Sequence, residues 1–149
     1  MTGPRTPTRD ALVRALADHP RDDMPNLPGR TNDVQAGILV PLVWSDEPIC
    51  ILTERPPTMR RHAGEICFPG GRPEPGDASL EATALREARE EVGVRSVELI
   101  GRLSTVPLLT SEHRLHPFVG LVDAGELAPD PREVHRIVRF SLLELLSRE

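Results

Sequence analysis

One segment, from Gly71 to Val94, constrains the fold of this chain more than any other: a glycine-rich turn runs directly into an amphipathic helix. At about 100° per residue, Glu91 lies about +40° and Glu90 about −60° around the helix from Glu87, so the three carboxylates share an arc of roughly 100°. Like charges at this spacing repel, and a hard divalent cation such as Mg²⁺ or Mn²⁺ would offset the repulsion. A solvated face of ion pairs with arginines of the same helix is the alternative interpretation.

The remaining sequence favours one α/β domain. Apolar periodicity predicts a helix over residues 8–19, and residues 20–33, rich in Pro, Asp and Gly, predict an exposed linker. The chain therefore divides into an N-terminal helix and linker (1–33) and a main domain (34–149). Strands are predicted over 34–44, 49–53, 63–68, 97–106, 116–122 and 133–140, a turn over 69–71, and helices over 79–92, capped by Ser79, and from 141 to 146. The apolar face of the 79–92 helix, which should pack on the sheet and leave the carboxylates beside a groove, is Leu80, Ala84, Leu85, Ala88 and Val92.

Composition excludes several classes of function. A length of 149 residues suffices for a single core, and a net charge of −5 argues against nucleic acid as the main partner. The sequence has no run of 18 apolar residues that would span a membrane, and its polar N-terminus lacks the apolar core of a signal peptide. Two cysteines, Cys50 and Cys67, do not make a disulfide framework, so free thiols and a reducing, cytoplasmic location are expected.

The order of residues around the helix carries a family resemblance. A Phe-Pro-Gly-Gly turn precedes the helix, and Arg86-Glu87-Ala88-Arg89-Glu90-Glu91-Val92-Gly93-Val94 closes it. This series resembles the Nudix box, G-x5-E-x7-R-E-U-x-E-E-x-G-U with U apolar, and fills its second half completely. The first half departs from the pattern, because Asp77 stands where the box has Glu and eight residues separate it from Arg86.

A second resemblance concerns the segment ahead of the box. Leu52-Thr53-Glu54-Arg55, followed by Met59-Arg60-Arg61-His62-Ala63-Gly64-Glu65-Ile66-Cys67-Phe68-Pro69-Gly70-Gly71, looks like the coenzyme A pyrophosphatase branch of the Nudix hydrolases. That branch tends to show the same Asp and extra residue inside the box. The resemblance implies a Nudix-type α/β/α sandwich with a mixed sheet. Members of the branch continue past the equivalent of residues 141–146, so we expect this chain to lack a last strand and helix, to expose an apolar patch there, and to be able to form a homodimer at the uncovered sheet edge.

The resemblance also implies a metal site for Mg²⁺ or Mn²⁺. Glu87 and Glu91 correspond to its principal ligands, and Glu90 to a further ligand or a residue that positions water. The backbone carbonyl of Gly70 or Gly71 would complete the shell. Zinc is not expected, because no histidine and cysteine stand at zinc-binding spacing.

Further roles follow from the same resemblance. Arg86 is expected to fix the carboxylates through hydrogen bonds, and Glu133 is the candidate general base, with a surface acid before a strand as the other interpretation. For Arg55, Arg60 and His62 the resemblance favours recognition of substrate phosphates over three solvated cations on a loop.

Two classes of function remain. The favoured one is a metal-dependent hydrolase that cleaves the pyrophosphate bond of a small nucleotide substrate, coenzyme A or acyl-CoA, to give 4′-phosphopantetheine and adenosine 3′,5′-bisphosphate. ADP-ribose and other nucleoside diphosphate derivatives are rival substrates within this class. The other class is a non-catalytic nucleotide-binding or regulatory module, which the intact glutamate set disfavours.

Overall fold

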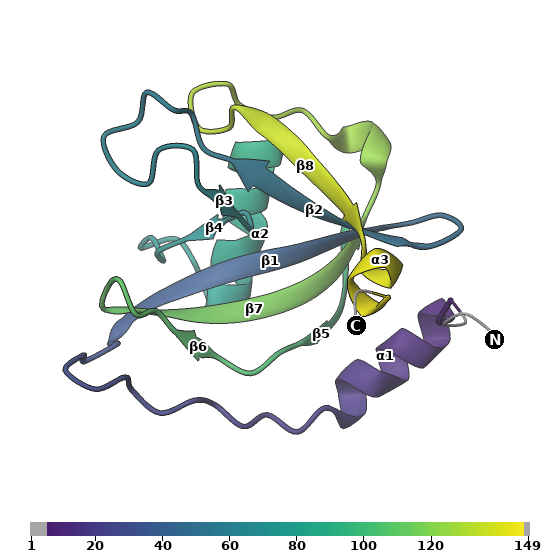
Figure 1. The fold of residues 1–149 in the computed structure, drawn as a ribbon, viewed down its shortest axis with the longest axis horizontal. Helices are drawn as coiled ribbons and strands as arrows, with labels where there is room; N and C mark the ends of the chain where they lie inside the picture. The colour runs from purple at the N-terminus through teal and green to yellow at the C-terminus, as the bar shows by residue number, and fades with distance from the viewer. Residues whose placement is uncertain (1–5, 148–149) are drawn as a thin grey trace.

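A computed structural model describes residues 6–147, in which the strands form one mixed sheet (Figure 1). In chain order the elements are α1 (Arg9–Asp18), β1 (Val34–Trp44), β2 (Pro48–Glu54), β3 (Ile66–Cys67), β4 (Gly70–Gly71), α2 (Leu80–Val92), β5 (Val97–Arg102), β6 (Val106–Pro107), β7 (His113–Val122), the 3₁₀ turn η1 (Ala124–Glu126), β8 (Arg136–Ser141) and α3 (Leu142–Leu146). The predicted helix at 8–19 is α1, and the predicted strand at 34–44 coincides with β1.

The sheet is split along one edge of β1. The other edge of β1 pairs in parallel with β7, from Val34 opposite His113 to Leu42 opposite Leu121. On the split edge, β1 pairs first with β4 and then, from Leu42 onward, with β2. Further along, β2 pairs with β3 instead of with β1, so β1 and β2 diverge and the short strands β3 and β4 line the opening between them. The other edge of β2 pairs with β8.

Around this opening the predicted boundaries were partly wrong. The predicted strand at 63–68 is extended only as β3, because His62 and Gly64 take left-handed φ angles of 55° and 70° that turn the chain. Conversely, Gly70–Gly71, predicted as part of a turn, is the strand β4. A glycine is needed at position 70, since a Cβ there would lie 2.6 Å from the Gly37 carbonyl oxygen.

Helix α2 covers one face of the sheet and is held by its ends. Ser79 caps it by accepting a hydrogen bond from the Ala82 amide at 3.1 Å, and Gly93 ends it with a φ of 78°. Of the predicted apolar face, Ala84, Ala88 and Val92 are fully buried, whereas Leu80 and Leu85 are only half-buried. Thr83 is buried in addition, because its hydroxyl donates to the carboxylate of Asp77 at 2.9 Å.

The core has two layers, one on each face of the sheet. Between α2 and the sheet lie Leu39, Ala84, Ala88, Val92, Val94 and Val122. The opposite face buries Leu42, Cys50 and Val119 together with Leu16 of α1. Figure 1 shows α2 passing behind the strands and α3 in front of them. The expected α/β/α sandwich with a mixed sheet is therefore confirmed.

Three further strands differ from their predicted ranges. The strand predicted over 97–106 is interrupted after β5, because the Thr105 amide donates to Asp23 of the linker at 2.8 Å instead of to a strand. Strand β7 begins at His113, earlier than predicted. Strand β8 begins later than predicted, because the amides of Glu133 and Val134 turn back onto the Asp130 carbonyl.

Helix α3 brings exposed apolar side chains to the C-terminal end of the described chain. Ser141, predicted as the first residue of this helix, is its N-cap, and Leu145 and Leu146 are 53 % and 65 % exposed. Both cysteines are free thiols. Within residues 6–147, no helix has the length and apolar character needed to cross a membrane.

Candidate active site

The turn and helix predicted to carry the chemistry lie in direct contact. A Cβ on Gly37 would lie 2.2 Å from the Leu80 carbonyl oxygen, so the start of α2 rests on the backbone of β1. A Cβ on Gly71 would lie 2.5 Å from Oε1 of Glu87. A side chain at Gly37 would push α2 away, and one at Gly71 would displace the Glu87 carboxylate, which now lies against the backbone of β4.

Arg86 is the hub that orders the acidic residues. Its Nη1 donates to Glu87 at 3.0 Å and to Glu90 at 3.2 Å. Its Nε and Nη2 each donate to an oxygen of Asp77 at 3.0 Å, so this carboxylate binds the guanidinium with two hydrogen bonds. Arg86 beside it lowers the pKa of Asp77 to about 2, with help from the Glu74 amide. Asp77, the residue that departs from the box, thus anchors Arg86.

Glu87, Glu91 and Glu133 form a second group, in which neighbouring carboxylates repel one another. Burial, followed by the charges of Glu87 and Glu133, raises the pKa of Glu91 to about 8. Burial is also the largest cause that raises the pKa of Glu87, whose side chain is 16 % exposed. Acids whose pKa values rise through burial and mutual repulsion favour a bound cation, which stabilises their charged forms.

Glu133 reaches this group because its loop is fastened to the end of α2. The amide of Asp130 donates to the Glu91 carbonyl at 2.9 Å, and the amide of Ala128 donates to Val92 at 2.8 Å. Val134, the next residue after Glu133, is buried. The structure therefore brings Glu133 close enough for its charge to raise the pKa values of Glu87 and Glu91, although the two segments are far apart in sequence.

The donor set fits a hard divalent ion. Glu87 and Glu91 offer carboxylate oxygens and Gly71 lies directly against Glu87, whereas Glu90 is half exposed and paired with Arg86. Across residues 6–147, no three His, Cys, Asp or Glu side chains form a ready metal cage. Mg²⁺ is usually held by only one or two protein carboxylates together with substrate phosphates, so two ligands and a backbone oxygen suit it.

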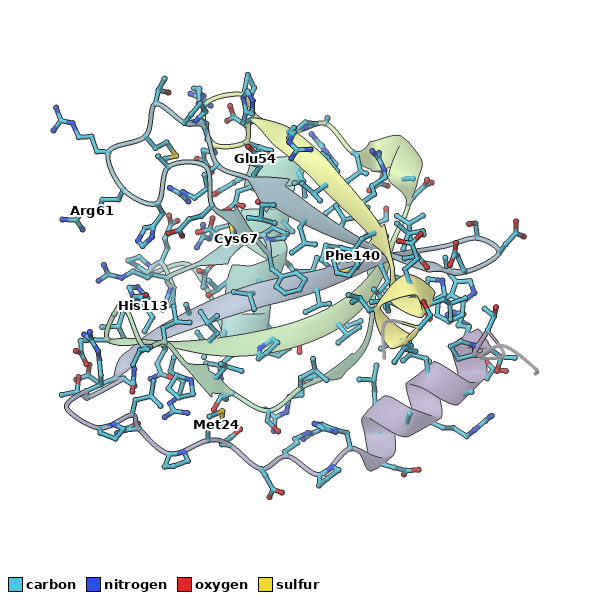
Figure 2. The ribbon with its side chains drawn as sticks, in the orientation of Figure 1. Met24, Glu54, Arg61, Cys67, His113 and Phe140 are labelled. Atoms are coloured by element: carbon cyan, nitrogen blue, oxygen red, sulfur yellow. The ribbon has the colours of Figure 1, made fainter. Side chains whose placement is uncertain are left out.

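A cavity of about 520 Å³ opens beside these residues. Gly70 and Gly71 form its end nearest the glutamates, and Arg55 and His62 come from the loop ahead of β3. The apolar part of its lining includes Ile38, Ile66, Phe68, Leu108 and Leu115. Figure 2 shows Cys67 on β3 and His113 at the start of β7, which also line it.

The predicted phosphate-binding residues separate into two groups. Arg55 and His62 line the cavity, and His62 is held by Glu65 at 3.0 Å. Arg60 is exposed and is not part of the lining. The Nε of Arg55 is buried, and among the described residues it has no hydrogen-bond partner.

The far wall of the cavity, formed by the loop between β6 and β7, was not predicted from the sequence. Leu108, Thr110 and Ser111 line the cavity from this loop, which is held by Asn32 of the linker. No local signal identifies such a wall, because Asn in a polar linker and Thr-Ser-Glu in a loop are ordinary surface compositions.

The comparisons with known proteins agree with this geometry. Residues 33–149 match the NUDIX domain family. Proteins named uncharacterized Nudix hydrolase NudL from Photorhabdus laumondii, Klebsiella aerogenes and Yersinia pestis are 42 %, 44 % and 40 % identical to the chain over 120, 115 and 117 residues. The alignments cover 78 %, 76 % and 76 % of this chain and 63 %, 92 % and 58 % of those proteins. The chain thus spans less than two thirds of the Photorhabdus and Yersinia relatives.

Solved structures share the fold. The NUDIX hydrolase of Nitrosomonas europaea superposes with a TM-score of 0.60 at 21 % identity, covering 74 % of this chain and 58 % of that one. The NUDIX domain of Shewanella oneidensis NrtR, solved with ADP ribose, gives 0.59 at 20 % identity, covering 89 % of this chain and 84 % of that one. The sandwich, the box helix with its arginine hub and the family match lead to one conclusion: the chain belongs to the Nudix hydrolase family.

Proposed function

We propose that this chain is a metal-dependent pyrophosphohydrolase that cleaves coenzyme A or acyl-CoA to 4′-phosphopantetheine and adenosine 3′,5′-bisphosphate. The family resemblance of the segment before the box suggests this substrate, and the arrangement of the cavity supports it. The observation that carries the proposal is Arg55, whose buried Nε has no partner among the described residues in a cavity that ends at Gly70 and Gly71.

The catalytic end of the proposal rests on the carboxylates. A bound Mg²⁺ or Mn²⁺ would neutralise pyrophosphate oxygens and help activate water. Glu87 and Glu91 would hold it, and Arg86 keeps Glu87 in place through the 3.0 Å contact. Glu133, beside Glu91, would accept the proton of the attacking water, provided that water lies within hydrogen-bond reach.

The recognition end rests on the cavity. Coenzyme A carries a 3′-phosphate in addition to its pyrophosphate, and it has a long pantetheine arm with few charges. The guanidinium of Arg55, whose Nε has no partner among the described residues, is suited to bidentate binding of a phosphate, and the apolar side chains that line the rest of the cavity suit the uncharged arm. Arg55 with His62 would thus bind phosphate, while Phe68 and its neighbours contact the arm.

A hydrolysis screen with Mg²⁺ and Mn²⁺ tests the proposal. Coenzyme A should be cleaved with a higher kcat/KM than 3′-dephospho-coenzyme A, ADP-ribose or nucleoside triphosphates. Arg55→Ala should reduce kcat/KM for coenzyme A by roughly 10- to 150-fold, the effect of losing one charged hydrogen-bonded contact. Arg61→Ala is the matched control, because Figure 2 shows Arg61 on the outer rim of the same loop.

Other outcomes would redirect the proposal. Preference for ADP-ribose, or equal rates on coenzyme A and its 3′-dephospho form, would overturn the substrate. Binding of nucleotides without any cleavage would favour a regulatory module. The intact set of Arg86, Glu87 and Glu91 with Glu133 nearby supports catalysis instead.

A further inference from the structure

The substrate cavity has one wall with little secondary structure of its own. This wall is the loop of residues 108–112 with His113, between β6 and β7, and it contributes Leu108, Thr110, Ser111 and His113 to the lining. The bond from the Leu108 amide to the His113 carbonyl, at 2.9 Å, closes the base of the loop. Its shape between those residues depends on contacts from elsewhere in the chain.

Asn32 supplies such contacts from the N-terminal linker. Its side-chain Nδ2 donates to the carbonyls of Leu108 at 3.1 Å, Ser111 at 3.3 Å and His113 at 3.3 Å. Its Oδ1 accepts from the amide of Leu27 at 2.9 Å. The residue is 1 % exposed and has a φ of 43°, a left-handed conformation that Asn adopts more readily than most residues.

Glu112, which belongs to the wall, accepts hydrogen bonds from the linker. Its carboxylate accepts hydrogen bonds from the amides of Thr31 at 2.6 Å and Asn32 at 3.1 Å, and from Arg30 at 2.9 Å. The hydroxyl of Thr31 also donates to it. The linker and the wall are therefore joined by reciprocal bonds, which we call the clasp and define as Arg30, Thr31, Asn32 and Glu112. Figure 1 shows the linker running past β6 to the start of β1.

We propose that Asn32 and Glu112 are positioning residues that set the shape of the substrate cavity, so that the linker ahead of β1 controls substrate affinity. The inference rests on the proposed function, in that the cavity is taken as the substrate site. Among the described residues, the clasp donates and accepts hydrogen bonds at the wall and not at the glutamates of α2, so its loss should act on KM and leave kcat nearly unchanged.

Two substitutions at Asn32 separate its side chain from its backbone conformation. Asn32→Gly keeps the left-handed conformation available and removes the three bonds to the wall. Asn32→Asp keeps the size of the side chain but places oxygens against three carbonyls. Both variants, and Glu112→Gln, should raise KM for coenzyme A at least about tenfold, a change of 1.4 kcal/mol in binding. We expect kcat to stay within about threefold of wild type.

Glu126→Gln provides the matched control. Glu126 accepts hydrogen bonds from the amides of Arg95 at 2.8 Å and Ser96 at 3.0 Å, and none of these residues lines the cavity. Like Glu112, it is a carboxylate that binds two consecutive backbone amides, but it lies away from the cavity. Its loss should leave KM at the wild-type value.

Two measurements that do not depend on turnover, hydrogen exchange and ligand binding, test the role of the clasp independently of the proposed hydrolysis. Hydrogen exchange of the 108–113 amides should accelerate in the Asn32 and Glu112 variants, and calorimetry with metal-free protein should show weaker coenzyme A binding. An unchanged KM and unchanged binding, with or without faster exchange, would overturn the inference, as would equal effects of Glu126→Gln. If wild type binds coenzyme A without cleaving it and the clasp variants weaken binding, the inference stands and the proposed function fails. If wild type neither binds nor cleaves it, both are overturned.

Discussion

At the scale of single residues, the acidic side chains of α2 have different surroundings although they share one helix. Glu90 is paired with Arg86 and half exposed, whereas Glu91 is more buried and its pKa is raised by burial and by two neighbouring carboxylates. Glu133, one of these two carboxylates, comes from outside α2, and so does Gly70, whose backbone hydrogen bond with Glu91 lowers the pKa against them. Residues of one type at one spacing can therefore have separate roles.

Glu91→Gln tests the most buried member of this group. An amide oxygen is a neutral and weaker ligand, so kcat/KM should fall on the order of 10²-fold, or ~2.7 kcal/mol of transition-state stabilisation. The fold should be retained, because the substitution removes repulsion from Glu87 and Glu133. Steady-state kinetics and circular dichroism provide the measurement.

Glu81→Gln is the control for this prediction, since Glu81 is exposed in the first turn of the same helix. It should retain wild-type activity. A folded Glu91→Gln protein that turns over within tenfold of wild type would refute the assignment of Glu91 as a metal ligand.

At the scale of elements, the contact between α2 and β1 depends on the absence of a side chain. Gly37→Ala would place a methyl group 2.2 Å from the backbone oxygen of Leu80, which cannot move without moving the helix. Overpacking of this kind costs about 1–3 kcal/mol of unfolding free energy. Thermal or urea unfolding should show this loss, together with lower activity because Glu87 moves with the helix.

Gly76→Ala is the matched control, because no atom lies within 4 Å of the added Cβ. Its unfolding free energy should equal or slightly exceed that of wild type, since alanine reduces the entropy of the unfolded chain. Equal stability of the Gly37 and Gly76 variants would contradict the close packing described for α2.

The clasp between linker and wall makes stability depend on pH. Hydrogen bonds from the Asn32 amide, the Thr31 hydroxyl and Arg30 lower the pKa of Glu112 from 4.5 to about 2. A lowered pKa means that the carboxylate stabilises the fold at pH above about 4.5, and that this contribution disappears as the pH falls toward 2. The difference in unfolding free energy between wild type and Glu112→Gln should therefore be largest near neutral pH.

Acid titration of both proteins, followed by thermal unfolding, measures this difference. Taking the difference removes contributions common to both, such as that of Asp77, whose pKa is also about 2. A gap between wild type and Glu112→Gln that stays constant from pH 7 to pH 2.5 would show that Glu112 is not charged in the clasp.

Periodicity and capping predicted the long elements well, and contacts between distant segments explain where they failed. Residues 34–44 and 79–92 carry their own signals, a β-branched run and a capped amphipathic pattern, and both were predicted correctly. The strand at 97–106 was predicted too long because Asp23, 82 residues away from Thr105, takes the amide that would have continued it. No window of sequence contains such a competitor.

The sequence indicated the glutamates of the box, but it did not indicate which other residues line the cavity. The box pattern indicated Glu87 and Glu91, and the structure places Glu87 against Gly71, one of the residues that line the cavity. It was the tertiary fold that separated Arg55, in the lining, from Arg60, outside it. The role of Asn32 depends on three carbonyls that lie 76 to 81 residues further along the chain, so local sequence could not reveal it.

At the scale of the whole molecule, metal binding should be coupled to folding. Unfolding separates Glu87, Glu91 and Glu133, so a cation bound among them would stabilise the folded state only. At 100 times its dissociation constant, Mg²⁺ or Mn²⁺ should add ~2.7 kcal/mol, which raises Tm by about 5–10 °C for a domain of this size. Chelation should reverse the shift.

Differential scanning fluorimetry with added metal, with sodium at equal ionic strength as control, measures this coupling. The shift should be absent in Glu91→Gln and present in Glu81→Gln. An unchanged wild-type Tm with either divalent ion would remove the metal from the proposed mechanism.

The split in the sheet also limits how the chain can vary in length. Phe68 lines the cavity, and Gly71 lies against Glu87. Between them, the Pro69 carbonyl accepts a hydrogen bond from the Leu39 amide of β1 at 2.9 Å. The four consecutive residues 68–71 therefore fix the separation between the two ends of the site. One inserted residue would shift one end against the other by about 3.3 Å, more than the roughly 1 Å misplacement that already impairs an active site. Insertions and deletions should therefore be tolerated better at the exposed Arg60 and Arg61 than between Phe68 and Gly71.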